Sequence, residues 1–259
     1  MIDALYIGAA GMAAQQTTVD TISNNLANVN TPTYKKSRVS FEDMVYRPVV
    51  TKSLLENSEN VDIKLGTGVS VTGIGKLFTL GDLKKTDNSL DVAIKGQGFL
   101  EVIMPDGSSA YTRAGTLAVN RDGMLSAAGG NSLMQMIRVP PDTKELFIDA
   151  DGMVRATLPN EAKPVELGQI ELAVFPNPGG LNPSGDNLYS LTDRSGQPLF
   201  AKPGSDGSGG LIQGYLESSN VQLVEEMVNL MLAQRAYEVN TKIVQAADEM
   251  LSMSNNLRR

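Results

Sequence analysis

The sequence lacks cysteine, histidine and tryptophan throughout its 259 residues. Without cysteine there is no disulfide framework, no thiolate nucleophile and no Fe–S cluster. Without histidine, the chain has neither the usual general base near neutral pH nor the commonest transition-metal ligand. Any enzyme built from this sequence would depend on carboxylates, lysine, tyrosine or hydroxyl groups. We therefore expect no cofactor, no metal site and no enzymatic activity.

Aromatic residues and positive charge are also scarce. Aromatics make up 5% of the chain, and 22 basic against 29 acidic residues give a formal net charge of −7. A chain with few stacking surfaces and an acidic balance is not expected to bind nucleic acid. No stretch reaches the roughly 18 to 20 apolar residues of a membrane helix, so no membrane insertion is expected. No basic residue precedes the apolar run Ala4–Ala14, which argues against a cleaved signal peptide.

Heptad patterns lie at both ends of the chain. Steps of three and four residues between apolar positions are typical of a helix that packs along one face. At the N-terminus these positions include Leu5, Met12, Val19, Ile22, Leu26 and Val29. At the C-terminus they are Ala236, Val239, Ile243, Ala246, Met250, Met253 and Leu257. We call these two sets the seam residues.

The C-terminal helix carries more apolar residues than one partner helix can cover. Beside its seam lies a further set: Leu230, Tyr237, Val244, Ala247 and Leu251. Two interpretations stay open: the terminal helices pair only within one molecule, or the seam residues also pack between subunits. Pro32 predicts that the first helix ends near residues 30–32. Ser219 and Gln222 fit a capping box at the start of the second helix.

The middle of the chain reads as a β domain. Residues 66–216 hold most of the glycine and proline, and Asp–Gly turn signals follow Pro105, Arg121, Ala150 and Ser205. Strands are predicted at Asp91–Ile94, Phe99–Met104, Leu117–Val119, Ser132–Val139, Ile170–Phe175 and Leu188–Leu191. The predicted fold is α+β: discontinuous N- and C-terminal helices form a coiled-coil-like domain, with a central all-β domain inserted between them. The expected ranges are 1–34 and 217–259 for the helices, 35–65 for an extended or irregular arm, and 66–216 for the β domain. Within the last range, Lys202–Gly210 is expected to be a flexible return to the second helix.

Three features that resemble chemical motifs have simpler explanations. The Gly66-x-Gly68 and Gly96-x-Gly98 sequences do not open a helix after a strand, so they favour turns or bulges over phosphate loops. The Asp–Gly pairs do not form the alternating acidic loop of a calcium site, and they favour hairpin turns. No pair of carboxylates stands out as a candidate for glycoside hydrolysis.

Three blocks of sequence resemble the bacterial flagellar rod and hook family. The N-terminal block, residues 23–35, contains Asn24, Asn25, Ala27, Asn28 and Tyr34, with Thr33 where that family usually has glycine. The second block, Asp91–Leu100, resembles the opening of the family's β domain and is followed by Tyr111–Gly115 and Asn120–Leu125. The third comprises Gly214–Val221 and the positions Gln234, Arg235, Tyr237, Glu238 and Asn240. A length of 259 residues fits the distal-rod members better than the shorter proximal-rod or the longer hook members.

The resemblance implies a structural subunit that self-assembles into a hollow helical tube and transmits torque from motor to hook. Its implied location is the basal body, in the rod that spans the periplasm, after flagellar type III export without a cleaved signal peptide. The implied partners are further copies of the chain, proximal rod and hook subunits, the surrounding ring proteins and the export apparatus. A hook or proximal-rod subunit stays open as an alternative, as do a rod-associated peptidoglycan hydrolase and a monomeric binding module. Under the favoured hypothesis, the seam residues pack within and between subunits.

Overall fold

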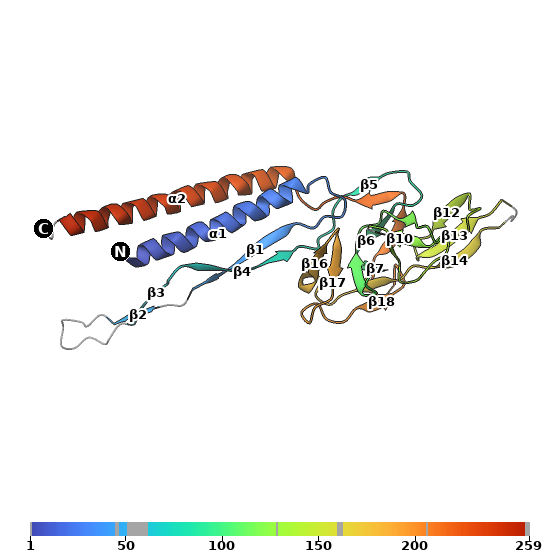
Figure 1. The fold of residues 1–259 in the computed structure, drawn as a ribbon, viewed down its shortest axis with the longest axis horizontal. Helices are drawn as coiled ribbons and strands as arrows, with labels where there is room; N and C mark the ends of the chain where they lie inside the picture. Colours follow the sequence, from blue (N-terminus) through green and yellow to red (C-terminus); the bar gives the residue numbers. More distant parts are fainter. Residues whose placement is uncertain are drawn as a thin grey trace. The chain divides into compact units, whose positions relative to one another are not determined.

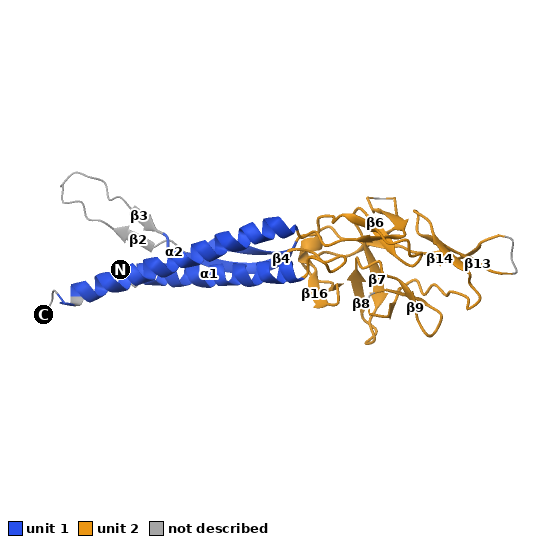
Figure 2. Ribbon diagram, turned by 90° about the horizontal axis from the view of Figure 1, so that it is seen from above, with its two compact units in different colours: residues 1–27, 37–76, 222–259 blue, residues 28–36, 77–221 orange. Residues whose placement is uncertain are grey.

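A computed structural model describes residues 2–44, 47–50, 62–127, 129–159, 163–205 and 207–256. The chain divides into two compact units, shown in different colours in Figure 2. Unit 1 contains residues 1–27, 37–76 and 222–259, and unit 2 contains residues 28–36 and 77–221. The chain therefore passes from one unit to the other four times.

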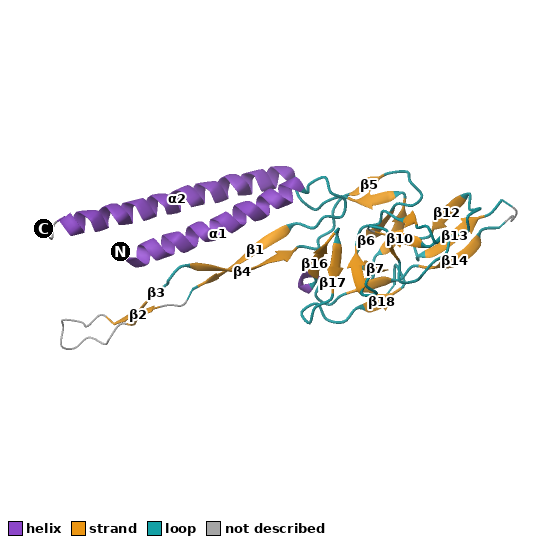
Figure 3. Cartoon of the chain, in the orientation of Figure 1, coloured by secondary structure: helices purple, strands orange, loops and turns teal. Residues whose placement is uncertain are grey.

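Unit 1 is built around two antiparallel helices, α1 (Ile2–Ala27) and α2 (Leu223–Asn256), which run side by side in Figure 1. Two glycines of α1 let the helix backbones approach closely. A Cβ atom on Gly8 would lie 2.7 Å from Val244, and one on Gly11 would lie 2.8 Å from Asn240. The predicted pairing of discontinuous terminal helices around a β-rich middle is confirmed, and Figure 3 shows this division.

Both helices are shorter than expected at the ends that face the middle of the sequence. α1 ends at Ala27, several residues before Pro32, because residues 28–33 form turns. α2 begins at Leu223. The carbonyl of the preceding residue, Gln222, accepts a hydrogen bond from Glu226 N–H in the first turn of the helix. The proposed capping box is wrong: the Ser219 hydroxyl accepts from Val221 N–H instead, within the turn that precedes the helix.

Part of the expected irregular arm is a β hairpin. Strand β1 (Ser37–Asp43) pairs antiparallel with β4 (Val69–Lys76), and β2 (Arg47–Val50) pairs with β3 (Asp62–Leu65). Because β4 pairs with β1, residues 69–76 belong to unit 1. The sequence pattern had predicted them to be part of the central β domain. A register shift between Ser40 and Phe41 leaves Thr72 of β4 without an opposite residue and marks a bulge. The hairpin packs along α1, where a Cβ atom on Gly68 would lie 3.6 Å from the Ile7 Cα.

Unit 2 contains the remaining strands, arranged in several antiparallel sheets. The largest has six strands in the order β16-β17-β8-β7-β15-β18, and two three-stranded sheets have the orders β11-β10-β9 and β12-β13-β14. Two further pairs are β19-β6 and β20-β5. The strands are β5 (Leu83–Lys85), β6 (Val92–Lys95), β7 (Phe99–Ile103), β8 (Ser109–Thr112), β9 (Ala118–Val119), β10 (Leu125–Ala127), β11 (Asn131–Ser132), β12 (Glu145–Ile148), β13 (Met153–Thr157), β14 (Val165–Gln169), β15 (Leu172–Val174), β16 (Asn182–Gly185), β17 (Leu188–Ser190), β18 (Leu199–Ala201), β19 (Gly210–Gln213) and β20 (Tyr215–Glu217), with a 3-10 turn at Pro178–Gly180.

Most of the predicted strands and turns are present. Gly107, Gly123 and Gly152 adopt left-handed φ angles in the turns before β8, β10 and β13, as their Asp–Gly signals indicated. The fourth signal involves Asp206, which lies outside the described residues. The strand expected at Ser132–Val139 is wrong, because only β11 and two isolated bridges occupy that range and Met136 adopts a φ of 47°.

The core of unit 2 lies between its sheets. It joins aliphatic side chains of β6, β7, β10, β13 and β15. A second cluster is aromatic, with Phe99, Tyr111, Phe175 and Tyr189 among its members and Phe78 packed against it. The segment after Lys202 does not return directly to a helix, since it leads into β19 and β20. Among the described residues, no helix has the length and apolar character needed to cross a membrane.

Candidate functional site

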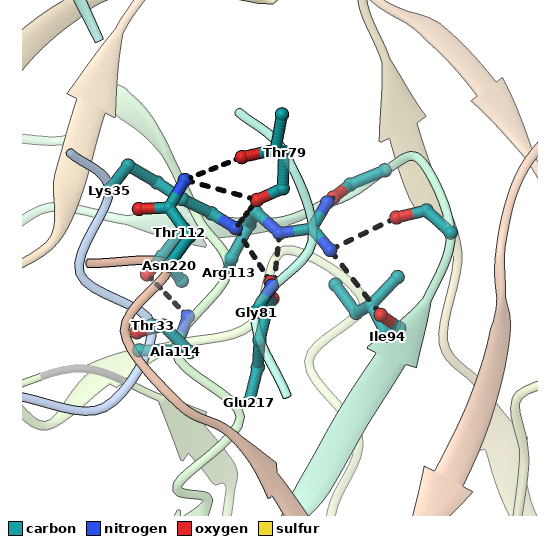
Figure 4. Close-up of polar contacts among 12 residues, drawn as sticks. Thr33, Lys35, Thr79, Gly81, Ile94, Thr112, Arg113, Ala114, Glu217 and Asn220 are labelled. Carbon is teal, nitrogen blue, oxygen red and sulfur yellow. Dashed lines mark hydrogen bonds and ion pairs between the residues drawn. The ribbon is translucent and has the colours of Figure 1, made fainter. Parts of the chain in front are cut away.

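Three charged side chains meet in the interior of unit 2, each from a different part of the chain (Figure 4). Lys35 comes from the N-terminal block, Arg113 follows β8, and Glu217 ends β20. Lys35 Nζ lies 2.6 Å from Glu217 Oε1, and Arg113 Nε lies 3.0 Å from Glu217 Oε2. All three side chains are at most 3% exposed. We call this cluster the ionic clamp.

Backbone groups satisfy the remaining donors and acceptors of the clamp. Gly81 N–H donates to Glu217 Oε1 at 2.9 Å, and Lys35 Nζ donates to the Thr79 carbonyl at 2.7 Å. The Arg113 guanidinium donates to the carbonyls of Ile94, Gly96 and Gly98, and it lies over the Phe99 ring at 5.7 Å. The Gly96-x-Gly98 sequence therefore belongs to a turn, as expected, and the carbonyls of that turn hold an arginine.

The clamp contains two cations and one anion, and their pKa values reflect this. Burial lowers the pKa of Lys35, and the nearby charge of Arg113 lowers it further, against the attraction of Glu217. Burial alone would raise the pKa of Glu217, but the charges of Arg113 and Lys35 outweigh it and bring that pKa below its ordinary value. Burial also raises the pKa of the neighbouring Tyr189 to about 12. The site is thus a dry interior in which the carboxylate stays ionised because it is paired.

Asn220 ties together the segments that enter and leave unit 2. Its Oδ1 accepts from Lys36 N–H at 2.7 Å, and its Nδ2 donates to the Leu77 carbonyl at 2.8 Å and to Thr79 Oγ1 at 2.9 Å. Leu77 N–H in turn donates to the Lys36 carbonyl at 2.9 Å. The chain crosses into or out of unit 2 at residues 36, 77 and 221, which are three of its four crossings between the units. The Asn220 side chain therefore joins the unit 2 ends of these three crossings.

Thr33 occupies an unfavourable backbone conformation beside the clamp. Its φ is 59°, in the left-handed region, and its side chain is buried. Glycine adopts this conformation freely, whereas a β-branched residue does so at a cost. Thr33 N–H donates to the Glu217 carbonyl at 2.8 Å, and Asn187 Nδ2 donates to the Pro32 carbonyl at 3.1 Å. The turn is therefore held from both sides, which is why threonine persists where the resemblance expects glycine.

A second buried polar contact lies within unit 1. Asn25 Nδ2 donates to Glu226 Oε2 at 3.0 Å and to the Ser37 carbonyl at 2.9 Å, and Asn25 Oδ1 accepts from Ser37 N–H at 2.8 Å. One asparagine thereby joins α1, α2 and the start of β1. The other family-motif positions differ in burial. Tyr34 is buried, Asn28 and Asn240 are half-buried, and the exposed positions are Asn24, Ala27, Gln234, Arg235, Tyr237 and Glu238.

The seam residues separate into two groups. On α1, Ile22 is buried and Leu5, Met12, Val19 and Leu26 are half-buried, while Val29 lies beyond the helix in unit 2. On α2 the residues that contact α1 include Val244, Asn240, Thr241 and Glu226, none of which belongs to the predicted seam. The α2 seam is largely open: Val239, Ile243, Ala246, Met250 and Met253 are exposed, Ala236 is half-buried, and Leu257 lies outside the described residues.

This arrangement defines a structural class of protein. The buried charges hold segments of the chain together and have no open path to a substrate, and the open apolar surface lies along a helix. Within the described residues, no group of three or more acidic side chains is placed to hold a metal ion.

Comparison with known proteins gives the family. Three family models match in chain order: "Flagella basal body rod protein" at residues 5–35, "Flagellar hook protein FlgE/F/G D1 domain" at 93–156, and "Flagellar basal body rod FlgEFG protein C-terminal" at 212–257. The flagellar basal-body rod protein FlgG of Buchnera aphidicola subsp. Schizaphis graminum is 42% identical over 260 residues, which cover 99% of this chain and 100% of that protein. The FlgG proteins of Borreliella burgdorferi and Bacillus subtilis are 41% and 37% identical, each over the full length of both chains. The chain therefore belongs to the flagellar basal-body rod FlgEFG family, whose members are structural and non-enzymatic.

Proposed function

We propose that this chain is a structural subunit of the distal flagellar rod and that it polymerises through the α2 seam. The observation that carries the proposal is the exposure of that seam. Val239, Ile243, Met250 and Met253 are each between 45% and 58% exposed although they form one continuous apolar stripe. Burying such side chains stabilises an interface by about 1.5 to 3 kcal/mol each. A second copy of the chain is the natural partner in a family of full-length rod proteins.

The geometry of α2 supports a contact with a different molecule. At about 100° per residue, the seam lies roughly 120° around the helix from the face that contacts α1. The helix therefore has two apolar faces, one filled within the subunit and one open. A contact between two different surfaces of identical subunits builds a helical polymer when the rotation from one subunit to the next does not close into a ring.

The clamp and the Asn25 contact supply stiffness in this proposal. A rod that carries torque must resist twisting within each subunit, and the chain connects its two units through four covalent passages. Asn220 joins three of these passages at their unit 2 ends, and Asn25 joins α1 to β1 in unit 1. Buried polar contacts of this kind resist sliding because each displaced group would be left unpaired.

The remaining assignments extend this role. We infer a location in the periplasm-spanning part of the basal body, reached by flagellar export without signal-peptide cleavage. The proposed neighbours are proximal rod subunits on one side, hook subunits on the other, and the ring proteins that surround the rod. These assignments rest on membership of the family and on the resemblance of the whole chain to rod proteins.

A pair of matched variants of the full chain tests the proposal. Ile243→Asp places a charge in the seam, and Gln245→Asp places the same charge on another exposed position of α2. Negative-stain electron microscopy of concentrated protein should show tubes for the unchanged chain and for Gln245→Asp, but not for Ile243→Asp. Far-UV circular dichroism should show the same helix content in all three. Equal assembly of the two variants would refute the seam as the interface.

A further inference from the structure

Unit 2 has an apolar groove at the end of β7 that its fold does not fill. The groove has a volume of about 330 Å³, and its apolar lining consists of Ile103, Met104, Pro105, Met124 and Met136. Methionine side chains adapt their shape to a partner, and their sulfur atoms make favourable contacts with aromatic rings.

Backbone strain presents one of these methionines to solvent. Met136 is 58% exposed and adopts a φ of 47°, which is a costly conformation for a residue with a side chain. Asp106, next to Pro105 of the lining, is exposed and accepts hydrogen bonds from Ser108, which lower its pKa. The groove therefore carries a negative charge at its rim.

A complementary apolar edge lies elsewhere on the same unit. Strand β18 is an outer strand of the six-stranded sheet, and its Leu199 and Phe200 are 66% and 50% exposed. Lys202 follows the strand and is also exposed. In the part of the chain that the structure describes, neither Lys202 nor Asp106 forms an ion pair.

The edge cannot fill the groove of its own subunit. Phe200 pairs with Ala173 of β15, and Ala173 pairs with Phe99 at the start of β7. The groove lies at the opposite end of β7, about 13 Å along the strand direction and two strand spacings of about 4.8 Å across the sheet. Any contact between the two must join different molecules.

We propose that the groove of one copy receives Phe200 of a second copy, with Lys202 beside Asp106. This inference rests on the proposed function, since it assigns a second contact between copies within the same polymer. The two surfaces differ, one concave and acidic at its rim and the other convex and followed by a lysine. Such a head-to-tail contact can repeat from copy to copy, as a helical assembly requires.

Cysteine cross-linking tests the contact directly, because the chain contains no cysteine of its own. A full-length Met136→Cys/Phe200→Cys variant should, after assembly and oxidation, give a ladder of covalent multimers on a non-reducing gel. The two single variants should stay monomeric. A Leu80→Cys/Phe200→Cys variant, which pairs the edge with another exposed unit 2 position, should give no ladder. Tubes without a ladder would overturn this inference alone, whereas an unchanged chain that forms no tubes would overturn the proposed function.

A charge exchange covers the case in which the cysteine variants fail to assemble. Asp106→Lys and Lys202→Asp change exposed side chains, so they should leave folding intact. Each alone places like charges together and should raise the critical concentration for assembly about tenfold. The double variant restores opposite charges and should return that concentration to near its original value. A double variant that assembles no better than either single variant contradicts the contact.

Discussion

Removal of the single anion in the ionic clamp should destabilise unit 2 more than removal of one of its two cations. The formal charge of Lys35, Arg113 and Glu217 together is +2 − 1 = +1. Glu217→Gln raises it to +2 in a buried site, and leaving buried charges uncompensated costs about 3 to 5 kcal/mol. The glutamine oxygen can still accept from Gly81 N–H, but the amide nitrogen then faces the Arg113 Nε donor, so the loss combines the missing charge with the missing Arg113 bond.

Lys35→Met is the matched comparison. It leaves one cation paired with one anion, and a methionine side chain fills much of the space that the lysine stem occupied. The cost is then mainly the lost donor to the Thr79 carbonyl, about 1 to 3 kcal/mol. The Glu217→Gln/Lys35→Met double variant returns the cluster to +1 and should be more stable than the sum of the single losses predicts.

Urea unfolding below the concentration for assembly measures these differences. The buried Tyr111 and Tyr189 make tyrosine fluorescence sensitive to the unfolding of unit 2, whereas Tyr6 and Tyr237 of unit 1 are already exposed in the folded chain, and no tryptophan interferes. The unfolding free energy should be highest for the unchanged chain, lower for Lys35→Met and lowest for Glu217→Gln. Equal unfolding free energies for Glu217→Gln and Lys35→Met would refute the idea that Glu217 stabilises unit 2 by balancing two buried positive charges.

Three further predictions concern the pH dependence of the clamp and two contacts within unit 1. Since the folded-state pKa of Glu217 is lowered, its stabilisation is complete above the ordinary pKa of 4.5 and is lost as the pH falls through the folded value, so an acid titration of stability should be steeper for the unchanged chain than for Glu217→Gln. Asn25→Ala leaves both backbone groups of Ser37 without this partner and should lower the unfolding free energy, followed by the helical signal at 222 nm, by about 2 to 3 kcal/mol, whereas Gln245→Ala, at an exposed position of α2, should change it little. Gly8→Leu places a side chain against Val244 and should cost about 1 to 3 kcal/mol in the same measurement, and an unchanged melting temperature would show that the helices do not pack this closely in solution.

The pairing of the terminal helices followed from heptad periodicity, but the choice of face on α2 did not. That helix has apolar residues in two stripes, and both stripes have the same spacing. The residues that decide the matter are polar or small: Glu226 and Asn240 face α1, and Gly8 and Gly11 let α1 approach. Val244, which belongs to the set beside the predicted seam, is the residue that meets Gly8. Periodicity identifies stripes but cannot say which of two stripes is buried within the subunit.

The ionic clamp could not be predicted from the residue types of its members. Lysine, arginine and glutamate are usually exposed, and nothing in a single sequence shows that Lys35 meets a residue 182 positions away. The one available signal was position, since each member lies in or beside a block that resembles the family. The β hairpin of unit 1 was missed for a related reason: β1 pairs with a strand about thirty residues later, and long-range pairing has no local pattern.

Thr33 shows how the fold constrains a position more strongly than residue preference does. The turn must place the Thr33 N–H against the Glu217 carbonyl and, two residues later, the Lys35 ammonium against the Glu217 carboxylate. A φ of 59° satisfies both contacts, at a backbone cost of about 1 to 2 kcal/mol for a residue other than glycine. The glycine that the resemblance expects at this position is therefore explained by backbone geometry, and its replacement by threonine depends on the strength of the buried contacts beside it.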